Sequence, residues 1–67
     1  MKQYDLEDLK AKLKELDTKI TPSERAIIAG FEQCSTVTVS TYLKGNITVP
    51  ALADAIIDRA NEILKKK

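Results

Sequence analysis

Cys34 is the only cysteine of this 67-residue chain, which also has no histidine. A chain this short buries only about 60% of the surface that its unfolded form exposes, and domains of this size commonly depend on disulfides, a bound metal or a partner subunit. A single cysteine excludes a disulfide within the chain, and without histidine a structural zinc site is implausible. We therefore expect one domain over residues 1–67, with no metal or cofactor, stabilised by helix packing and by homodimer formation.

The free thiol and the apolar pattern also bear on where the chain works. An unpaired cysteine fits a reducing cytosol better than a secreted scaffold. Residues 1–10 are charged and lack the apolar segment of a signal peptide, and no apolar run approaches the roughly 20 residues that span a bilayer. We expect a cytoplasmic protein without a membrane segment.

An amphipathic helix is predicted over residues 3–18. Apolar residues recur at every third or fourth position, which places them on one helix face: Leu6, Leu9, Leu13, Leu16 and Ile20. Acidic residues crowd the start of this segment and lysines follow, as the helix dipole prefers. Because the pattern covers barely more than two heptads, we expect the stripe to join the domain core rather than to form a free-standing coiled coil.

The segment Thr21-Pro22-Ser23-Glu24 marks the start of a second helix. Threonine is a favoured N-cap, proline is preset for the first helical position, and glutamate at the third position completes a capping box. Because these three signals agree, we predict a helix over residues 22–32.

A third helix is predicted over residues 36–44. Ser35 can cap its start, and Gly45 suits the left-handed conformation that ends many helices. Its two faces differ in character: Val39, Tyr42 and Leu43 on one, and Val37, Ser40, Thr41 and Lys44 on the other. The many β-branched residues favour a strand by propensity alone. The helical spacing and the two caps nevertheless agree on a helix.

The last helix is predicted over residues 50–65, with Pro50 in the first turn, where proline is tolerated. Its apolar residues fill an arc of roughly 140°: Leu52, Ala53, Ile56, Ile57, Ala60, Ile63 and Leu64. This arc is wider than so small a core needs, so we expect a homodimer to form through this helix. Together the four helices predict an all-α fold class, a small four-helix domain.

A resemblance to a known family rests on one run of eight residues. Thr38-Val39-Ser40-Thr41-Tyr42-Leu43-Lys44-Gly45 resembles the T-V-S-x-x-L-x-G run in the recognition helix of lactose-repressor-type and phage-repressor-like headpieces. The match covers about residues 25–45. It implies a helix-turn-helix DNA-binding domain whose two helices and turn lie at about residues 22–44.

The resemblance also implies details of the turn. Ala29 falls where the two helices of such a motif cross closely, and Gln33 falls where the backbone φ is positive and the family usually has glycine. A residue other than glycine costs about 1 kcal/mol there. Glu32 stands at a neighbouring position that is usually apolar. The family joins this motif to a large sugar-binding domain with no counterpart here, so we expect no small-molecule effector.

In such motifs the recognition helix lies in the major groove of DNA and reads base edges with its early and outward side chains. In this chain those residues are Thr36, Val37, Thr41 and Lys44. An outward valine can contact a thymine methyl group. Residues 36–44 contain no arginine, asparagine or glutamine, so we expect modest sequence specificity from each subunit, which a dimer would double.

Contacts to the DNA backbone are expected from two further groups. Hydroxyls near helix starts can donate to phosphates with help from the helix dipoles: Ser35, Ser40, Thr21 and Ser23. Positive charge would come from Arg25, Lys19 and Lys44.

The function predicted from these residues is sequence-specific binding of double-stranded DNA by a small, repressor-like transcriptional regulator. The alternative is a protein-interaction module that has the helix-turn-helix shape without DNA affinity. A net charge of only +1 and an uncharged recognition face favour that alternative. We do not expect an enzyme, because the chain has no histidine, no glycine-rich phosphate loop and no nucleophile with a nearby base.

Overall fold

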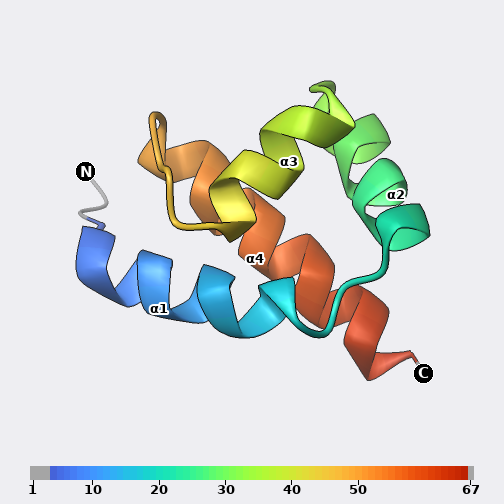
Figure 1. Ribbon diagram of the computed structural model, residues 1–67, viewed down its shortest axis with the longest axis horizontal. Helices are drawn as coiled ribbons and strands as arrows, with labels where there is room; N and C mark the ends of the chain where they lie inside the picture. The colour runs from blue at the N-terminus through green and yellow to red at the C-terminus, as the bar shows by residue number, and fades with distance from the viewer. Residues whose placement is uncertain (1–3, 67) are drawn as a thin grey trace.

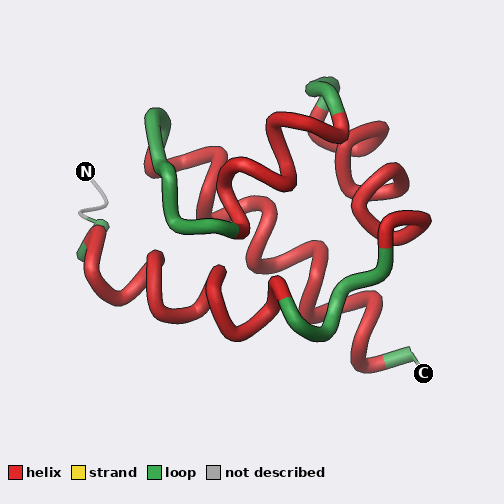
Figure 2. Tube along the Cα trace, in the orientation of Figure 1, coloured by secondary structure: helices red, strands yellow, loops and turns green. Residues whose placement is uncertain are grey.

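Four α-helices follow one another in this computed structural model, which describes residues 4–66 (Figure 1). Their bounds are Leu6–Asp17 for α1, Pro22–Glu32 for α2, Thr36–Leu43 for α3 and Pro50–Lys65 for α4. Loops alone join them, and residues 4–66 contain no strand (Figure 2). The predicted all-α fold class with four helices is confirmed, and α2 and α4 have the predicted bounds.

Helix α1 was predicted to begin at residue 3, which lies outside the described residues, but it begins at Leu6. Asp5 has an extended backbone, and its carboxylate accepts hydrogen bonds from the backbone N–H groups of Glu7 at 3.0 Å and Asp8 at 3.3 Å. Such an N-cap satisfies donors that a helix leaves open at its first turn. The helix therefore begins at Leu6.

The predicted caps of α2 and α3 are confirmed. Thr21 Oγ1 accepts from the backbone N–H of Glu24 at 3.2 Å, and the Glu24 carboxylate accepts from the backbone N–H of Thr21 at 2.9 Å. Ser35 Oγ accepts from the backbone N–H of Thr38 at 3.1 Å. At the other end of α3, Gly45 has φ of +97°, the left-handed conformation expected of it.

Most of the predicted apolar stripe of α1 lies in the core. Leu9, Leu13 and Leu16 are buried, and Ile20 is buried from the loop that follows the helix. Leu6 is 45% exposed, so its expected place in the core is wrong. It lies in the first turn of α1, one turn before Leu9, the first buried residue of the helix.

The apolar arc of α4 is largely used within the domain. In Figure 1, α4 passes behind the other helices, and it packs against both α1 and α2. Two flanking helices cover a wide arc, so Ala53, Ile56, Ile57 and Ala60 are all buried. The middle of this helix therefore has no uncovered apolar surface for the homodimer that the sequence suggested. The half-buried residues of the arc lie near the two ends of the helix: Leu52 at the start, and Ile63 and Leu64 at the end.

A tight turn of three residues, 33–35, joins α2 to α3. Gln33 has φ of +55° and ψ of +42°, so the expected positive φ at this position is confirmed. The backbone N–H of Cys34 donates to the carbonyl of Ala29 at 3.0 Å, which satisfies one of the carbonyls left open where α2 ends. Ala29 itself is buried. Among the helices of residues 4–66, none combines the length and apolar character needed to cross a membrane.

Candidate nucleic-acid interface

Helix α3 is held from one side and open on the other. Val39, Tyr42 and Leu43 are between 0 and 3% exposed and anchor the helix in the core. On the other side Val37 is 74% exposed, the largest value among the large apolar side chains of residues 4–66. Thr36 is also exposed. Packing within the domain therefore leaves this outward apolar side chain without a partner.

The hydroxyls predicted to face DNA already take part in local hydrogen bonds. Thr41 Oγ1 donates to the backbone carbonyl of Val37 at 2.9 Å, and Ser35 Oγ shares a 2.9 Å hydrogen bond with Thr38 Oγ1. A hydroxyl oxygen has two lone pairs as well as one proton. Both side chains thus retain some capacity for an outside partner, although less than an unbonded hydroxyl has.

Arg25 lies between helices instead of projecting into solvent. Its Nη2 atom donates to Asp17 Oδ1 at 2.8 Å and to the Asp17 carbonyl at 2.9 Å, while Nη1 donates to Ser40 Oγ at 3.4 Å. The Arg25 side chain is 18% exposed. The structure thus brings Arg25 and Ser40 together, but in a bridge that joins α1, α2 and α3.

The remaining predicted phosphate contacts lie at the start of α2, at the opposite end of that helix from the turn. Lys19 Nζ forms a 3.0 Å ion pair with Glu15 Oε1. Thr21 is occupied by the capping box, and Ser23 is exposed in the first turn of α2. These residues do not share the exposed face of α3.

Two lysines of α1, Lys10 and Lys14, lie near the C-terminal end of α3 and were missed by the sequence prediction. Gly45 packs against α1 so closely that a Cβ atom there would lie 3.2 Å from Lys14 Cε and 3.8 Å from Lys10 Cγ. Lys44 is exposed beside this contact. The i, i+4 spacing of Lys10 and Lys14 was the available signal, but only tertiary packing places α1 beside Gly45. We call Lys10, Lys14 and Lys44 the lysine cluster.

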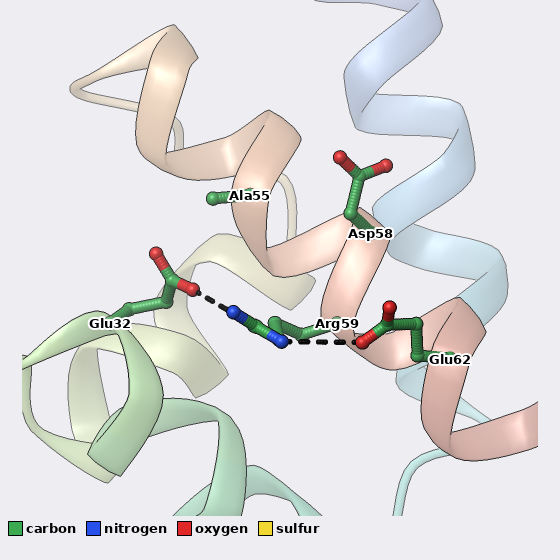
Figure 3. A pocket seen from close by; sticks show the side chains of 5 residues that line it. All are labelled: Glu32, Ala55, Asp58, Arg59 and Glu62. Atoms are coloured by element: carbon green, nitrogen blue, oxygen red, sulfur yellow. Dashed lines mark hydrogen bonds and ion pairs between the residues drawn. The ribbon is translucent and has the colours of Figure 1, made fainter.

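A groove of about 410 Å³ between α2 and α4 has the opposite charge (Figure 3). Its lining comprises Glu32, Ala55, Asp58, Arg59 and Glu62. Arg59 lies between two carboxylates, with Nε 3.5 Å from Glu32 and Nη1 3.2 Å from Glu62. Three carboxylates outnumber one guanidinium, so this groove disfavours phosphate. No group in residues 4–66 is arranged to hold a metal ion.

Two exposed apolar residues of α2 were also missed. Ile27 is 50% exposed and Phe31 is 62% exposed, and they stand one helical turn apart. Both line a hollow of about 180 Å³ with Ile63 and neighbouring charged residues of α4. Ile28 and Ala29 supply the buried face of α2, so Ile27 and Phe31 form a second apolar stripe, a signal visible in the sequence.

Cys34 lies in the turn between α2 and α3. It is half-buried and packs against the core. Burial raises the pKa of the Cys34 thiol above its usual value, and the negative charge of Glu32 raises that pKa further. The thiol therefore stays protonated at neutral pH, where its reactivity is low.

Comparison of the chain with protein-family models, with curated proteins and with solved structures found no match. Its function is therefore inferred from its own residues and their contacts.

Proposed function

We propose that this protein binds double-stranded DNA through the exposed face of α3, as a small repressor-like regulator working in the cytoplasm. The observation that carries the proposal is Val37, which is 74% exposed at the start of a helix whose other side is fixed in the core. A rigidly held helix with an outward apolar side chain suits direct contact with thymine methyl groups in the major groove. Thr36 and Thr41 would line the same groove.

Electrostatics support one orientation of that helix on DNA. Helix α3 has no acidic residue, and its C-terminal end adjoins the lysine cluster. Within residues 4–66, Lys10, Lys14 and Lys44 form no ion pair, so their charges are available to phosphates. Lys10 and Lys14 thus take over the phosphate contacts first predicted for Arg25.

The number of such contacts per chain is small. Helix α3 offers no side chain that reads guanine or adenine in a bidentate manner, so one copy would discriminate weakly between sequences. We propose that two copies act together on adjacent half-sites, which doubles the contacts. This part of the proposal adds a homodimer to the DNA-binding role.

The second candidate function is recognition of a protein partner by the same face of α3. It is favoured by the uncharged character of the helix, because an exposed valine flanked by threonines also suits a protein interface. Under this alternative the lysine cluster would be an ordinary solvated surface.

Selection from a pool of random duplexes tests the two functions against each other. Purified protein is mixed with the pool at low salt, and the retained duplexes are sequenced over several rounds. A recurrent motif containing thymine steps, confirmed by fluorescence anisotropy on one labelled duplex, supports DNA binding. Absence of enrichment, together with no binding below about 1 mM at low salt, would exclude the DNA-binding role, because even non-specific DNA binding is tighter than this.

A further inference from the structure

We infer that the exposed surface formed by Ile27, Phe31 and Ile63 binds a second copy of this chain about a two-fold axis. We call it the α2–α4 surface. The inference supplies an interface for the homodimer, which the buried middle of α4 cannot provide, and it stands whether or not the protein binds DNA.

The shape of the α2–α4 surface suits self-association. A two-fold contact uses the same patch on both subunits, so the patch must contain a projection and a matching hollow. Phe31 projects with 62% of its surface exposed, and the hollow of about 180 Å³ lies beside it. The guanidinium of Arg59 lies 4.4 Å from the centroid of the Phe31 ring and restricts the ring on one side. Aromatic and arginine side chains of this kind are enriched at the centres of protein interfaces.

Charged residues at the edge of this surface can pair with oppositely charged residues of a second copy. Asp58 and Glu62 of α4 and Lys66, its C-cap, recur at every fourth position, and because Lys66 keeps a helical backbone the three follow one side of the helix. If two copies of α4 run antiparallel about an axis at Glu62, Lys66 of each copy faces Asp58 of the other. The two Glu62 carboxylates meet at that axis, where each is offset by Arg59 of its own copy at 3.2 Å. Lys66 lines the hollow of the α2–α4 surface and Asp58 lines the neighbouring acidic groove, so the two adjoining regions together present both halves of an ion pair to a second copy.

The size of the molecule and its net charge permit the contact. The Cα atoms extend over 30 × 21 × 21 Å, so one face offers roughly 600 Å² per copy, the lower end for specific interfaces. The net charge of +1 produces little repulsion between copies. An interface at this lower end of the size range suits a weak, reversible dimer.

Sedimentation equilibrium of the full chain between 1 μM and 1 mM tests the inference without DNA. We expect the mass to rise from 7.5 kDa towards twice that value. Ile27→Gln with Phe31→Gln should raise the dissociation constant at least about tenfold, because the central anchors are lost. Leu6→Gln is the matched control, since Leu6 is 45% exposed at the first position of α1, outside the α2–α4 surface, and its substitution should leave dimerisation unchanged. Circular dichroism of dilute samples checks that all variants remain helical.

A charge exchange tests the antiparallel arrangement. Asp58→Lys alone and Lys66→Asp alone should each weaken the dimer about three- to tenfold, and the two together should restore it, as expected for a direct pair. A mass of 7.5 kDa at all concentrations, or a glutamine double variant that dimerises like the natural chain, would overturn the inference. If the natural chain dimerises but binds no DNA, that result would count against the proposed function and not against the dimer.

Discussion

Arg25 and Asp17 are joined twice, because Arg25 Nη2 donates to the Asp17 carboxylate at 2.8 Å and to the Asp17 backbone carbonyl at 2.9 Å. The carbonyl belongs to the last residue of α1, where a helix leaves acceptors without a partner. With its third hydrogen bond, to Ser40, this one guanidinium connects three helices. Its charge therefore stabilises the fold, although the sequence suggested a role on DNA.

We predict that Arg25→Ala lowers the free energy of unfolding by about 1–3 kcal/mol, because charged hydrogen bonds are lost and partly buried acceptors are left without a donor. Arg25→Lys should recover only part of this, since one ammonium group cannot reproduce the three donors in their fixed geometry. Urea unfolding followed by circular dichroism measures both. At temperatures where the variant is folded, its DNA affinity should fall less than that of a lysine-cluster variant.

Tyr42 holds the connection between α3 and α4. Its hydroxyl oxygen accepts from the backbone N–H of Val49 at 2.9 Å and shares a 2.6 Å hydrogen bond with Thr48 Oγ1. Val49 has no side-chain cap of its own at the start of α4. Tyr42→Phe should therefore destabilise the domain by about 1–2 kcal/mol, whereas Thr48→Val, which leaves the Val49 bond in place, should cost less. An equal cost for both variants would contradict this role for the Val49 hydrogen bond.

The two left-handed residues should respond oppositely to substitution. Gln33 has φ of +55°, so Gln33→Gly should stabilise the domain by up to about 1 kcal/mol by relieving backbone strain. Gly45→Ala should destabilise it by about 1–2 kcal/mol, because φ is +97° and a Cβ atom would lie 3.2 Å from Lys14 Cε. Thermal melting would show shifts of several degrees in opposite directions for a domain of this size. Shifts in the same direction would contradict the strain ascribed to Gln33 or the close packing at Gly45.

Variants of the α3 face should separate charge from base contact. Lys44→Ala and Lys14→Ala should each weaken binding on most duplexes and reduce the salt dependence by about one unit per subunit, because each removes a phosphate contact. Val37→Ser should mainly relax the preference for one thymine, by roughly 1 kcal/mol or more. Anisotropy titrations at two salt concentrations measure these effects.

Melting curves provide the control for these variants. Val37 and Lys44 are exposed, so their substitution should leave the melting temperature nearly unchanged. If Val37→Ser abolishes capture of a protein partner while no duplex is bound, the interaction-module function would replace DNA binding.

Cys34 predicts a particular pH dependence. Burial, and then the charge of Glu32, raise the pKa of its thiol in the folded state above the value of about 8.5 for a free cysteine. The folded state therefore holds its proton to higher pH than the unfolded state does. This contribution to stability is complete below the unfolded pKa and declines as pH rises above it. The natural chain should lose more stability than Cys34→Ser as pH rises from roughly 8 to 10, and native Cys34 should react with thiol reagents more slowly than the unfolded chain.

Local signals were sufficient to predict where three of the helices begin. Thr21 with Glu24, Ser35 and Pro50 act through their own backbone neighbours, so no knowledge of the fold is needed to interpret them. The same reasoning anticipated the left-handed Gly45, whereas the left-handed Gln33 was predicted from the resemblance to helix-turn-helix headpieces. Asp5 is an equally local cap, and counting it among the acidic residues of the first turn shifted the predicted start of α1.

The candidate site was less predictable because a side chain's role depends on which helix packs against it. Arg25 was assigned to DNA from its type alone. In the folded chain Asp17 neutralises its charge, and Ser40 accepts a hydrogen bond from it. Lys14 was assigned to the helix dipole, yet it lies against Gly45 at the end of α3.

The sequence by itself determined the helices, their caps and the residues that face inward, because these depend on contacts between residues only a few positions apart. Tertiary packing decided which surfaces remain open. It left Phe31 exposed, and it buried Ile57 between helices whose relative positions no local pattern specifies. The outward position of Val37 followed from the helical pattern of α3, but exposure elsewhere depends on distant neighbours, so the lysine cluster and the α2–α4 surface could be located only once the four helices were placed together.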